Sequence, residues 1–214
     1  MQLANLKKFY SKCRKVETPI FMAVIMWFLF RLCKKRIIIS NGVRIRGLRN
    51  IETRGLLQVG LDYAGFMNNR DLTYIRVDGH LIIRESYSIG KGCRVDVGRG
   101  AIVEVGRGYM NANSSFVIMH GLKVGNDCAI SWGVQILDDD FHEIQYAGKK
   151  RKSNPIEIGN HVWIGSNVTI LKGVIIPDGC VVASGAVVIS RFTEKNCLIG
   201  GNPARVIRKS INWS

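Results

Sequence analysis

The chain has 214 residues, of which 47% are hydrophobic, and it carries a formal net charge of +15. The hydrophobic content excludes a disordered basic protein, and the length predicts one folded domain with an appendage. The charge is concentrated near the start, because residues 1–54 carry a net +11 and residues 55–214 only +4. A nucleic-acid-binding domain spreads basic and aromatic residues over its folded face, and no such pattern is present, so we expect no nucleic acid as partner.

Residues 1–39 form a basic and apolar N-terminal segment. Its centre, TPIFMAVIMWFLF at 18–30, is uncharged and has basic residues on both sides. A helix of that length spans about 20 Å, less than the ~30 Å hydrocarbon core of a bilayer. A signal peptide would need a small-residue cleavage site, but the sequence continues RLCKKR. Two interpretations stay open. Residues 1–36 lie on an anionic membrane surface, or the helix packs on the folded body or on a neighbouring subunit; both can hold for different faces.

A six-residue repeat dominates the second half of the chain. An aliphatic residue recurs at positions 158, 164, 170, 176, 182 and 188, and the fifth residue of each unit is small or β-branched until the last. Earlier repeats, which slip in register, give positions 89, 95, 105, 111, 117, 124, 130 and 136. This period fits neither a helix face nor strand alternation, but it suits a short strand followed by a tight corner of Gly, Asn or Asp.

The repeat predicts a mainly β protein, a parallel β-helix over residues 40–202 with a short N-terminal helical segment and a C-terminal tail at 203–214. The spacing does not give the handedness. Three of the six cysteines, Cys93, Cys128 and Cys180, occupy equivalent positions of the repeat and are expected to be small apolar filler. No cysteine pair has metal-ligand spacing, so no metal site is expected, and reduced thiols fit a cytoplasmic protein.

Three segments carry a resemblance to a known family: DDDFH at 138–142, PIEIGNHVWIGSNVTILKGVIIPDGCVVASGAVV at 155–188 and GGNPARVI at 200–207. With these the chain resembles the hexapeptide-repeat acyltransferases, in particular the sugar and polysaccharide O-acetyltransferases. The resemblance implies a left-handed β-helix and a homotrimer whose active site lies between subunits. It also implies transfer of an acyl group from a coenzyme A thioester.

The repeat is interrupted at 137–157, where we expect the active-site loop. Acyl transfer to an alcohol needs a base for the hydroxyl proton, and the imidazole of His is suited to it near neutral pH. Of the four histidines only His142 follows an acidic cluster at the mouth of this loop, and by resemblance it occupies the family's catalytic position. Asp140 or Asp138 is expected to orient it, and the sequence does not choose between them.

Further site residues follow from the resemblance. The main-chain N–H of Ser166 is expected to hold the oxyanion, and Trp163 to pack against the pantetheine arm of acetyl-CoA. The other positions expected to contact the coenzyme are Ala183, Ser184 and Gly185 by their backbone and, at its phosphates, Arg205 and Arg208, with Arg191 weaker. The expected acceptor ligands are Asn111 and Asn113, with Ser131 weaker.

The predicted function is an O-acetyltransferase that moves acetyl from acetyl-CoA to a sugar hydroxyl of a cell-envelope polysaccharide or its precursor. The resemblance implies direct attack by the hydroxyl within a ternary complex. The protein is expected to be cytoplasmic, at a peripheral position on the inner face of the membrane. Two alternatives stay open: an N-acyltransferase of a nucleotide-linked amino sugar or another small-molecule acetyltransferase on the same fold, and a non-catalytic β-helical binding protein. A carbonic anhydrase would need three converging histidines, which the spacing of His120, His142 and His161 does not show.

Overall fold

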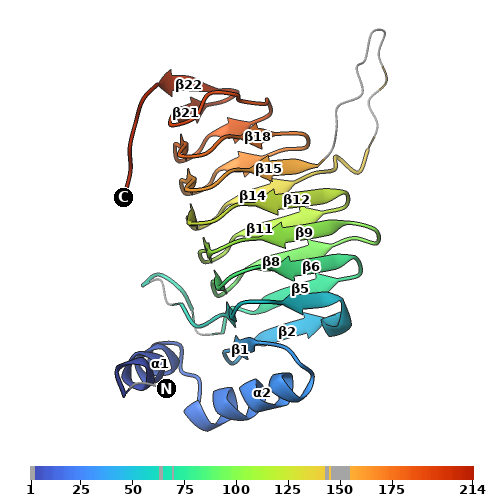
Figure 1. The fold of residues 1–214 in the computed structure, drawn as a ribbon, viewed down its shortest axis with the longest axis vertical. Helices are drawn as coiled ribbons and strands as arrows, with labels where there is room; N and C mark the ends of the chain where they lie inside the picture. Colours follow the sequence, from blue (N-terminus) through green and yellow to red (C-terminus); the bar gives the residue numbers. More distant parts are fainter. Residues whose placement is uncertain (1–2, 63–64, 69, 143–144, 146–154) are drawn as a thin grey trace.

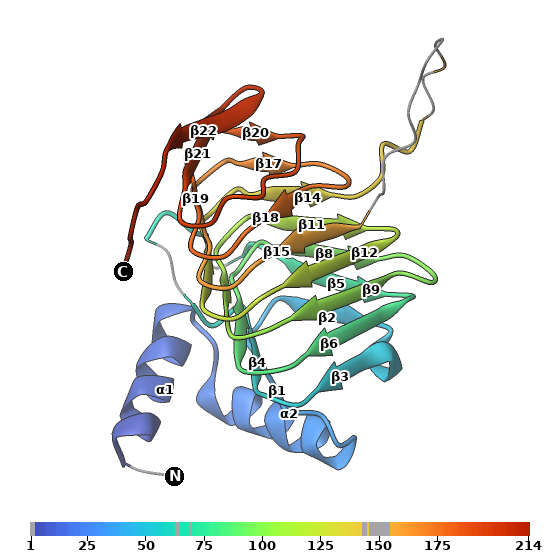
Figure 2. The same ribbon diagram turned by 45° about the horizontal axis from the view of Figure 1, so that its top comes forward.

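The structure is a computed structural model that describes residues 3–62, 65–68, 70–142, 145 and 155–214. The chain forms a column of stacked coils with two helices at one end (Figures 1 and 2). Three sheets, which we name A, B and C, form the sides of the column, and consecutive coils pair in parallel. The prediction of a mainly β, left-handed parallel β-helix with an N-terminal helical segment and a C-terminal tail is confirmed.

The strands pass from sheet A to B to C in each coil. Sheet A contains β1 (Ile37–Ile39), β4 (Leu57–Val59), β7 (Tyr87–Ile89), β10 (Gly108–Met110), β13 (Cys128–Ile130), β16 (Trp163–Ile164), β19 (Val181–Val182), β21 (Leu198–Gly201) and the antiparallel β22 (Ala204–Arg208). Sheet B contains β2 (Val43–Arg46), β5 (Thr73–Val77), β8 (Arg94–Val97), β11 (Ser115–Ile118), β14 (Gln135–Leu137), β17 (Thr169–Ile170) and β20 (Val187–Val188). Sheet C contains β3 (Ile51–Thr53), β6 (His80–Ile83), β9 (Ile102–Val105), β12 (Gly121–Val124), β15 (Ile156–Ile158) and β18 (Ile175–Ile176). A short 3-10 turn, Leu48–Asn50, precedes β3.

The aliphatic repeat fills the inside of the column. All six repeat positions from 158 to 188 are at most 2% exposed, and so are the small residues at the fifth position. Each coil there takes three repeat units, so that Ile164 pairs with Val182 in sheet A and Ile170 with Val188 in sheet B. The inward residue of each short strand packs on its counterparts above and below, which makes one continuous core.

Two of the earlier repeat positions were assigned wrongly. Asn111 and Val117 do not point into the core; Met110, Phe116 and Ile118 do. For Asn111 the reason is that β10 ends at Met110, whose buried side chain lies one position before the six-residue count. For Val117 it is that the four residues of β11 alternate between inside and outside. Burial in this part of the column follows the strand period rather than the hexapeptide period.

Two insertions interrupt the coils at different edges. We name the edges by the sheets that they join. Val59 pairs with Ile89 across a lengthened coil, because residues 61–72 are inserted at the A–B edge between β4 and β5. Ile130 pairs with Ile164 across another, because the second insertion leaves at the B–C edge between β14 and β15. The basic stretch at 149–152, noted in the sequence inside this second loop, lies outside the described residues.

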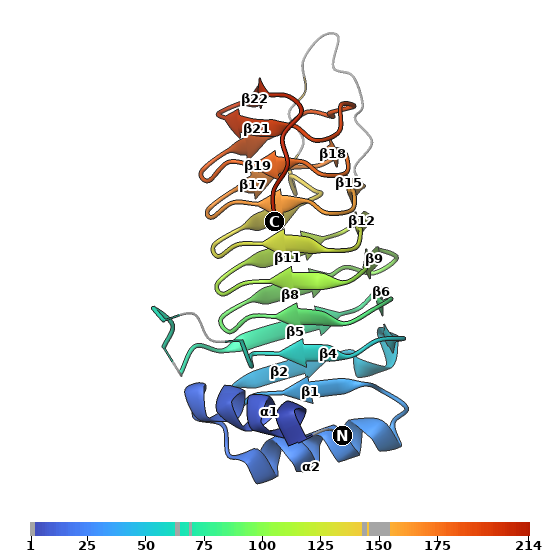
Figure 3. The same cartoon turned by 60° about the vertical axis from the view of Figure 1, so that its left-hand side comes forward.

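The two helices are α1 (Leu3–Lys15) and α2 (Ile20–Leu32), and α2 lies beneath β1 at the base of the column (Figures 1 and 3). Ala23 and Phe30 of α2 are buried against the rest of the chain, as one of the two interpretations expects. Its other side exposes large apolar side chains: Phe21 (67%), Ile25 (54%), Phe28 (57%) and Leu32 (66%). Among the described helices none is long and apolar enough to cross a membrane.

The environment of the cysteines makes a prediction about thiol reactivity. Five are buried and Cys33 is exposed, and burial raises the pKa of Cys93 to about 12 and that of Cys128 to about 11. At pH 8 these two thiols hold almost no thiolate, the reactive form. We expect one rapid equivalent with a disulfide reagent in the native protein and five more on unfolding. Cys33→Ser should remove the rapid phase, and several rapid thiols would contradict the buried arrangement.

Candidate active site

The aspartate cluster begins with a buried structural carboxylate. Asp138 follows β14, is 0% exposed and accepts hydrogen bonds from the backbone N–H groups of Met119 (2.6 Å), His120 (2.8 Å) and Gly121 (2.7 Å). These three donors lie where the chain turns from β11 into β12, one coil below. Such a set of amide donors satisfies a buried carboxylate well. In this chain, therefore, Asp138 ties the mouth of the loop to the neighbouring coil.

The next two aspartates have partners of their own. Asp139 lies 2.6 Å from Nε2 of His120 and accepts the backbone N–H of Phe141 at 2.6 Å. The hydrogen bond with His120, followed by that from Phe141, holds the pKa of Asp139 below its usual value. Asp140 pairs with Lys172 at 2.5 Å.

His142 is exposed at the outside of the B–C edge. Within the described residues, none of the three aspartates makes a hydrogen bond or an ion pair to it. The orienting roles expected of Asp138 and Asp140 therefore stay predictions.

A second group of candidates lies along the A–B edge. Asn111, Ser131 and Ser166 each follow a strand of sheet A, and the backbone stacks them: the Asn111 N–H donates to Ile130 O (2.8 Å) and the Ser131 N–H to Ile164 O (2.9 Å). One coil further on, this edge holds Ala183, Ser184 and Gly185. The structure thus brings the expected acceptor ligands and the expected coenzyme contacts into one row along the A–B edge.

Two of these candidates have structural tasks. Asn113 turns the corner with a φ of 55°, the conformation that Gly133 takes in the next coil with a φ of 69°. The backbone N–H of Ser166 donates to the Ser184 hydroxyl at 3.2 Å. The expected oxyanion donor is thus engaged, but with a side-chain hydroxyl, which a single χ1 rotation releases.

Trp163 lies on the outer face of sheet A and is 42% exposed. Its indole N–H donates to the Ser131 hydroxyl at 3.1 Å, which links the expected coenzyme face to the expected acceptor edge. Arg205 and Arg208 lie on β22, at the end of the same sheet beyond β19 and β21. Arg191 donates to Gly173 O at 3.0 Å and so has a structural partner.

The C-terminal tail adds an aromatic residue that the sequence interpretation missed. The tail turns back along the column (Figure 1), and the Trp213 ring stacks on His161 with centroids 4.1 Å apart. The indole N–H of Trp213 donates to His161 O, and Nε2 of His161 lies 3.0 Å from Trp213 O. The Trp213 ring centroid is also 6.1 Å from that of Trp163. The only local signal was a tryptophan in an otherwise polar terminus.

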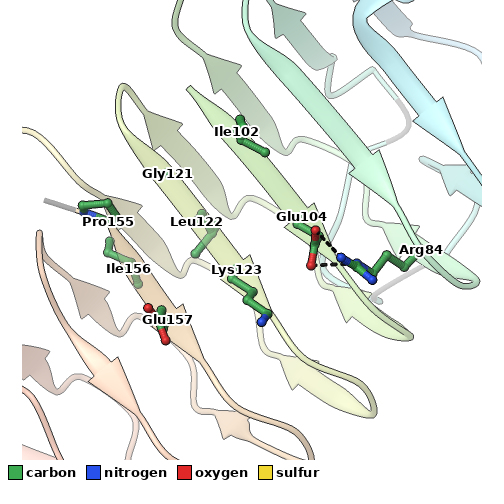
Figure 4. A pocket seen from close by; sticks show the side chains of 9 residues that line it. All are labelled: Arg84, Ile102, Glu104, Gly121, Leu122, Lys123, Pro155, Ile156 and Glu157. Atoms are coloured by element: carbon green, nitrogen blue, oxygen red, sulfur yellow. Dashed lines mark hydrogen bonds and ion pairs between the residues drawn. The ribbon is translucent and has the colours of Figure 1, made fainter. Parts of the chain in front are cut away.

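A shallow groove on sheet C holds none of the predicted residues (Figure 4). Its floor is low at Gly121, which has no side chain between Ile102 and Pro155. Arg84 and Glu104 pair at 2.7 Å along it. Among the described residues no cluster of three His, Cys, Asp or Glu could hold a metal ion.

His142 and the candidate residues of the A–B edge lie at different edges of one chain. The loop of His142 leaves sheet B toward sheet C, whereas Asn111, Ser131 and Ser166 connect sheet A to sheet B. A single chain therefore does not bring the candidate base to the candidate acceptor and coenzyme residues.

Comparison with known proteins adds independent findings. Residues 155–190 match the model for the bacterial transferase hexapeptide (six repeats). An uncharacterised 24.8 kDa protein in the cps region of Klebsiella pneumoniae is 40% identical over 206 residues, which cover 95% of this chain and 93% of that protein.

Solved structures of acetyltransferases are also similar to this chain. The polysialic acid O-acetyltransferase OatWY is similar with a TM-score of 0.53 and 27% identity, over 83% of this chain and 86% of that one. The polysialic acid-specific acetyltransferase NeuO shares the fold, with a TM-score of 0.51 and 24% identity over 83% and 78% of the two chains. The chain belongs to the hexapeptide-repeat acetyltransferase family.

Proposed function

We propose that the protein is an O-acetyltransferase that transfers acetyl from acetyl-CoA to a sugar hydroxyl of a cell-envelope polysaccharide or its precursor. The observation that carries the proposal is the 27% identity to a polysialic acid O-acetyltransferase over 83% of the chain, far beyond the repeat. The site geometry supports it, because two polar residues of the A–B edge (Asn111, Ser131) lie beside an exposed indole (Trp163), and β22 brings two arginines to the end of the same sheet.

In the proposed reaction His142 takes the proton of the acceptor hydroxyl as its oxygen attacks the thioester carbonyl. The C–S bond breaks, and the coenzyme leaves as a thiol with the proton returned by His142. The Ser166 N–H, freed from Ser184, stabilises the oxyanion. Trp163 and the small residues of the edge hold the pantetheine arm, and Arg205 and Arg208 its phosphates.

We infer a homotrimer, because His142 lies on a different edge from the residues that it must serve. In a closed ring the B–C loop of one chain can meet the A–B edge of the next, which completes each site.

The chemistry is tested by mass spectrometry of the envelope glycan from cells with and without the protein, where we expect a difference of one acetyl group per modified unit. In cells that produce His142→Ala the acetyl group should be missing, and the purified variant should lose about 10²–10⁴-fold in kcat. Coenzyme binding and trimer formation should be unchanged. His80→Ala, an exposed histidine of β6, is the matched control. Near-normal turnover by His142→Ala would exclude the proposed base.

Substitutions of two aspartates distinguish a structural role from a role in catalysis. Asp138→Asn replaces an acceptor of three buried N–H bonds with a group that has only one oxygen. The cost is about 1–3 kcal/mol, and each kcal/mol lowers Tm by about 2–4 °C in a chain of this size. Asp140, which is free of buried bonds and near His142 in the chain, is the better orienting candidate, so Asp140→Asn should lower kcat and leave Tm unchanged. Equal Tm values for wild type and Asp138→Asn would contradict this division.

We also propose that the helical end lies on the inner face of the membrane. The outer side of α2 is apolar, Arg31 lies in its last turn, and Lys34, Lys35 and Arg36 follow the helix. Apolar side chains at the acyl boundary and cations at anionic headgroups each favour such binding. We expect the protein to co-sediment with phosphatidylglycerol-containing vesicles at low salt and not with neutral ones. Phe28→Ser should weaken binding. Ile102→Ser should not, because Ile102 is an exposed side chain of similar kind on β9, away from the helices. Equal recovery with neutral and anionic vesicles would exclude the electrostatic contribution.

A further inference from the structure

A hollow of about 400 Å³ opens on the outer face of sheet A below Trp163, lined by Asp62, Ser88, Gly108, Tyr109, Met110 and Asn111. It is in the size range of small-molecule sites. Its shape depends on Gly108, since a Cβ there would lie 2.3 Å from Cys128 O. Any other residue at this position would shift the backbone of β10 that forms the floor.

Polar groups converge on the hollow from two sides. The Asp62 carboxylate accepts the hydroxyl of Ser88 and forms an ion pair with Lys12 of α1 at 2.5 Å. On the other side, the side-chain oxygen of Asn111 is fixed by the backbone N–H of Ala112 at 2.8 Å. Carboxylate, hydroxyl and amide thus offer both donors and acceptors at set positions.

Aromatic side chains border the same region and are unusually exposed. Tyr109, in the floor of the hollow, is 47% exposed. At the adjacent A–B edge Trp132 (44%) meets Phe66 (59%) edge to face, with ring centroids 5.6 Å apart. Phe66 lies between β4 and β5, whereas Trp132 lies at the corner after β13. Sheet A has β7 and β10 between β4 and β13, so the aromatic pair joins two segments that are three strands apart. Exposed apolar surface of this kind marks binding sites.

We propose that this hollow is a saccharide-binding site that holds the acceptor chain. A pyranose ring has an apolar C–H face and a rim of hydroxyl groups, and the hollow offers the complement of both. Tyr109 supplies the flat apolar surface, and Asp62, Ser88 and Asn111 supply the hydrogen bonds. The Phe66–Trp132 pair borders the position of the next sugar unit.

The position of the hollow relates it to the transfer site. Tyr109 is in register with Ala129, and Ala129 with Trp163, so the tyrosine and the tryptophan are two strands apart. At the usual strand spacing this is about 10 Å, roughly the length of two sugar units. A chain bound at Tyr109 thus extends past the small Ala129 to the Ser131 hydroxyl, where Trp163 also bonds. The acceptor role rests on the proposed function, whereas saccharide binding does not.

The test is equilibrium binding by calorimetry without acetyl-CoA, with short polysialic acid oligomers, maltotetraose and chitotetraose as probes. We expect at least one probe to bind, and Tyr109→Ala and Trp132→Ala each to weaken it by tenfold or more. Tyr109→Phe keeps the ring and should bind nearly as wild type. Tyr74→Ala is the matched control, because Tyr74 is 37% exposed on sheet B, away from the hollow.

The proposal is overturned if the wild type binds none of the probes. It is also overturned if Tyr109→Ala and Trp132→Ala, shown to be folded by an unchanged Tm, bind as tightly as wild type, or if Tyr74→Ala weakens binding equally. Failure of the proposed function has a different signature. A protein that binds saccharide through Tyr109 but transfers no acetyl group loses only the proposed chemistry. If Tyr109→Ala transfers acetyl with an unchanged KM for the acceptor, the proposed function stands and only the role of the hollow in binding the acceptor is excluded.

Discussion

Unbroken backbone pairing between consecutive coils is the constraint on which the rest of the structure depends. From β1 to β21 each strand hydrogen-bonds in parallel to its neighbours in the same sheet, so every coil must return the chain to register whatever its length. Corners achieve this with a residue in the left-handed conformation, as at Asn113, Gly133, Asn167 and Gly185. Extra residues can enter only at a corner without breaking a sheet. Both insertions lie at corners, and the chain keeps its core while it gains surface loops.

The same constraint separates the candidate catalytic groups. His142 follows β14 at the B–C edge, whereas Ser131 and Ser166 lie at the A–B edge, so His142 cannot share a site with them in its own chain without leaving its corner. Asp138 strengthens this separation, because its three backbone bonds fix the root of the loop to the coil below. A site between chains is the arrangement that the fold leaves open to these residues, and it makes assembly part of the proposed activity.

The sequence predicted the fold well where local spacing determines it. The regular coils follow the hexapeptide period strictly, so every inward position from 158 to 188 was correct. The earlier strands do not: β10 buries Met110 and not Asn111, and the four-residue β11 turns Val117 outward. The candidate residues of the A–B edge came from the resemblance to the hexapeptide-repeat acyltransferases, and the stacking of the coils places them along one edge. Trp213 and Phe66 were not predicted, since their contacts join segments far apart in the chain, and no local pattern records which coil a tail or loop meets. The burial of Asp138 and the exposure of Asp140 likewise depend on contacts with other coils, which no local pattern records.

Sheet A orders the candidate sites along one axis. The pairing of its strands places α1, through Lys12 and Asp62, at one end, then Tyr109, then Trp163, and finally the arginines of β22. On the proposed function, an acceptor that reaches the membrane-facing end would extend along this face, and a coenzyme whose phosphates meet β22 would extend toward it from the other end. The two would meet at the Ser131–Trp163 bond. On the same proposals the net charge of +15 would be divided by position: the cations at the helical end would face anionic lipid, and those of β22 would face phosphate.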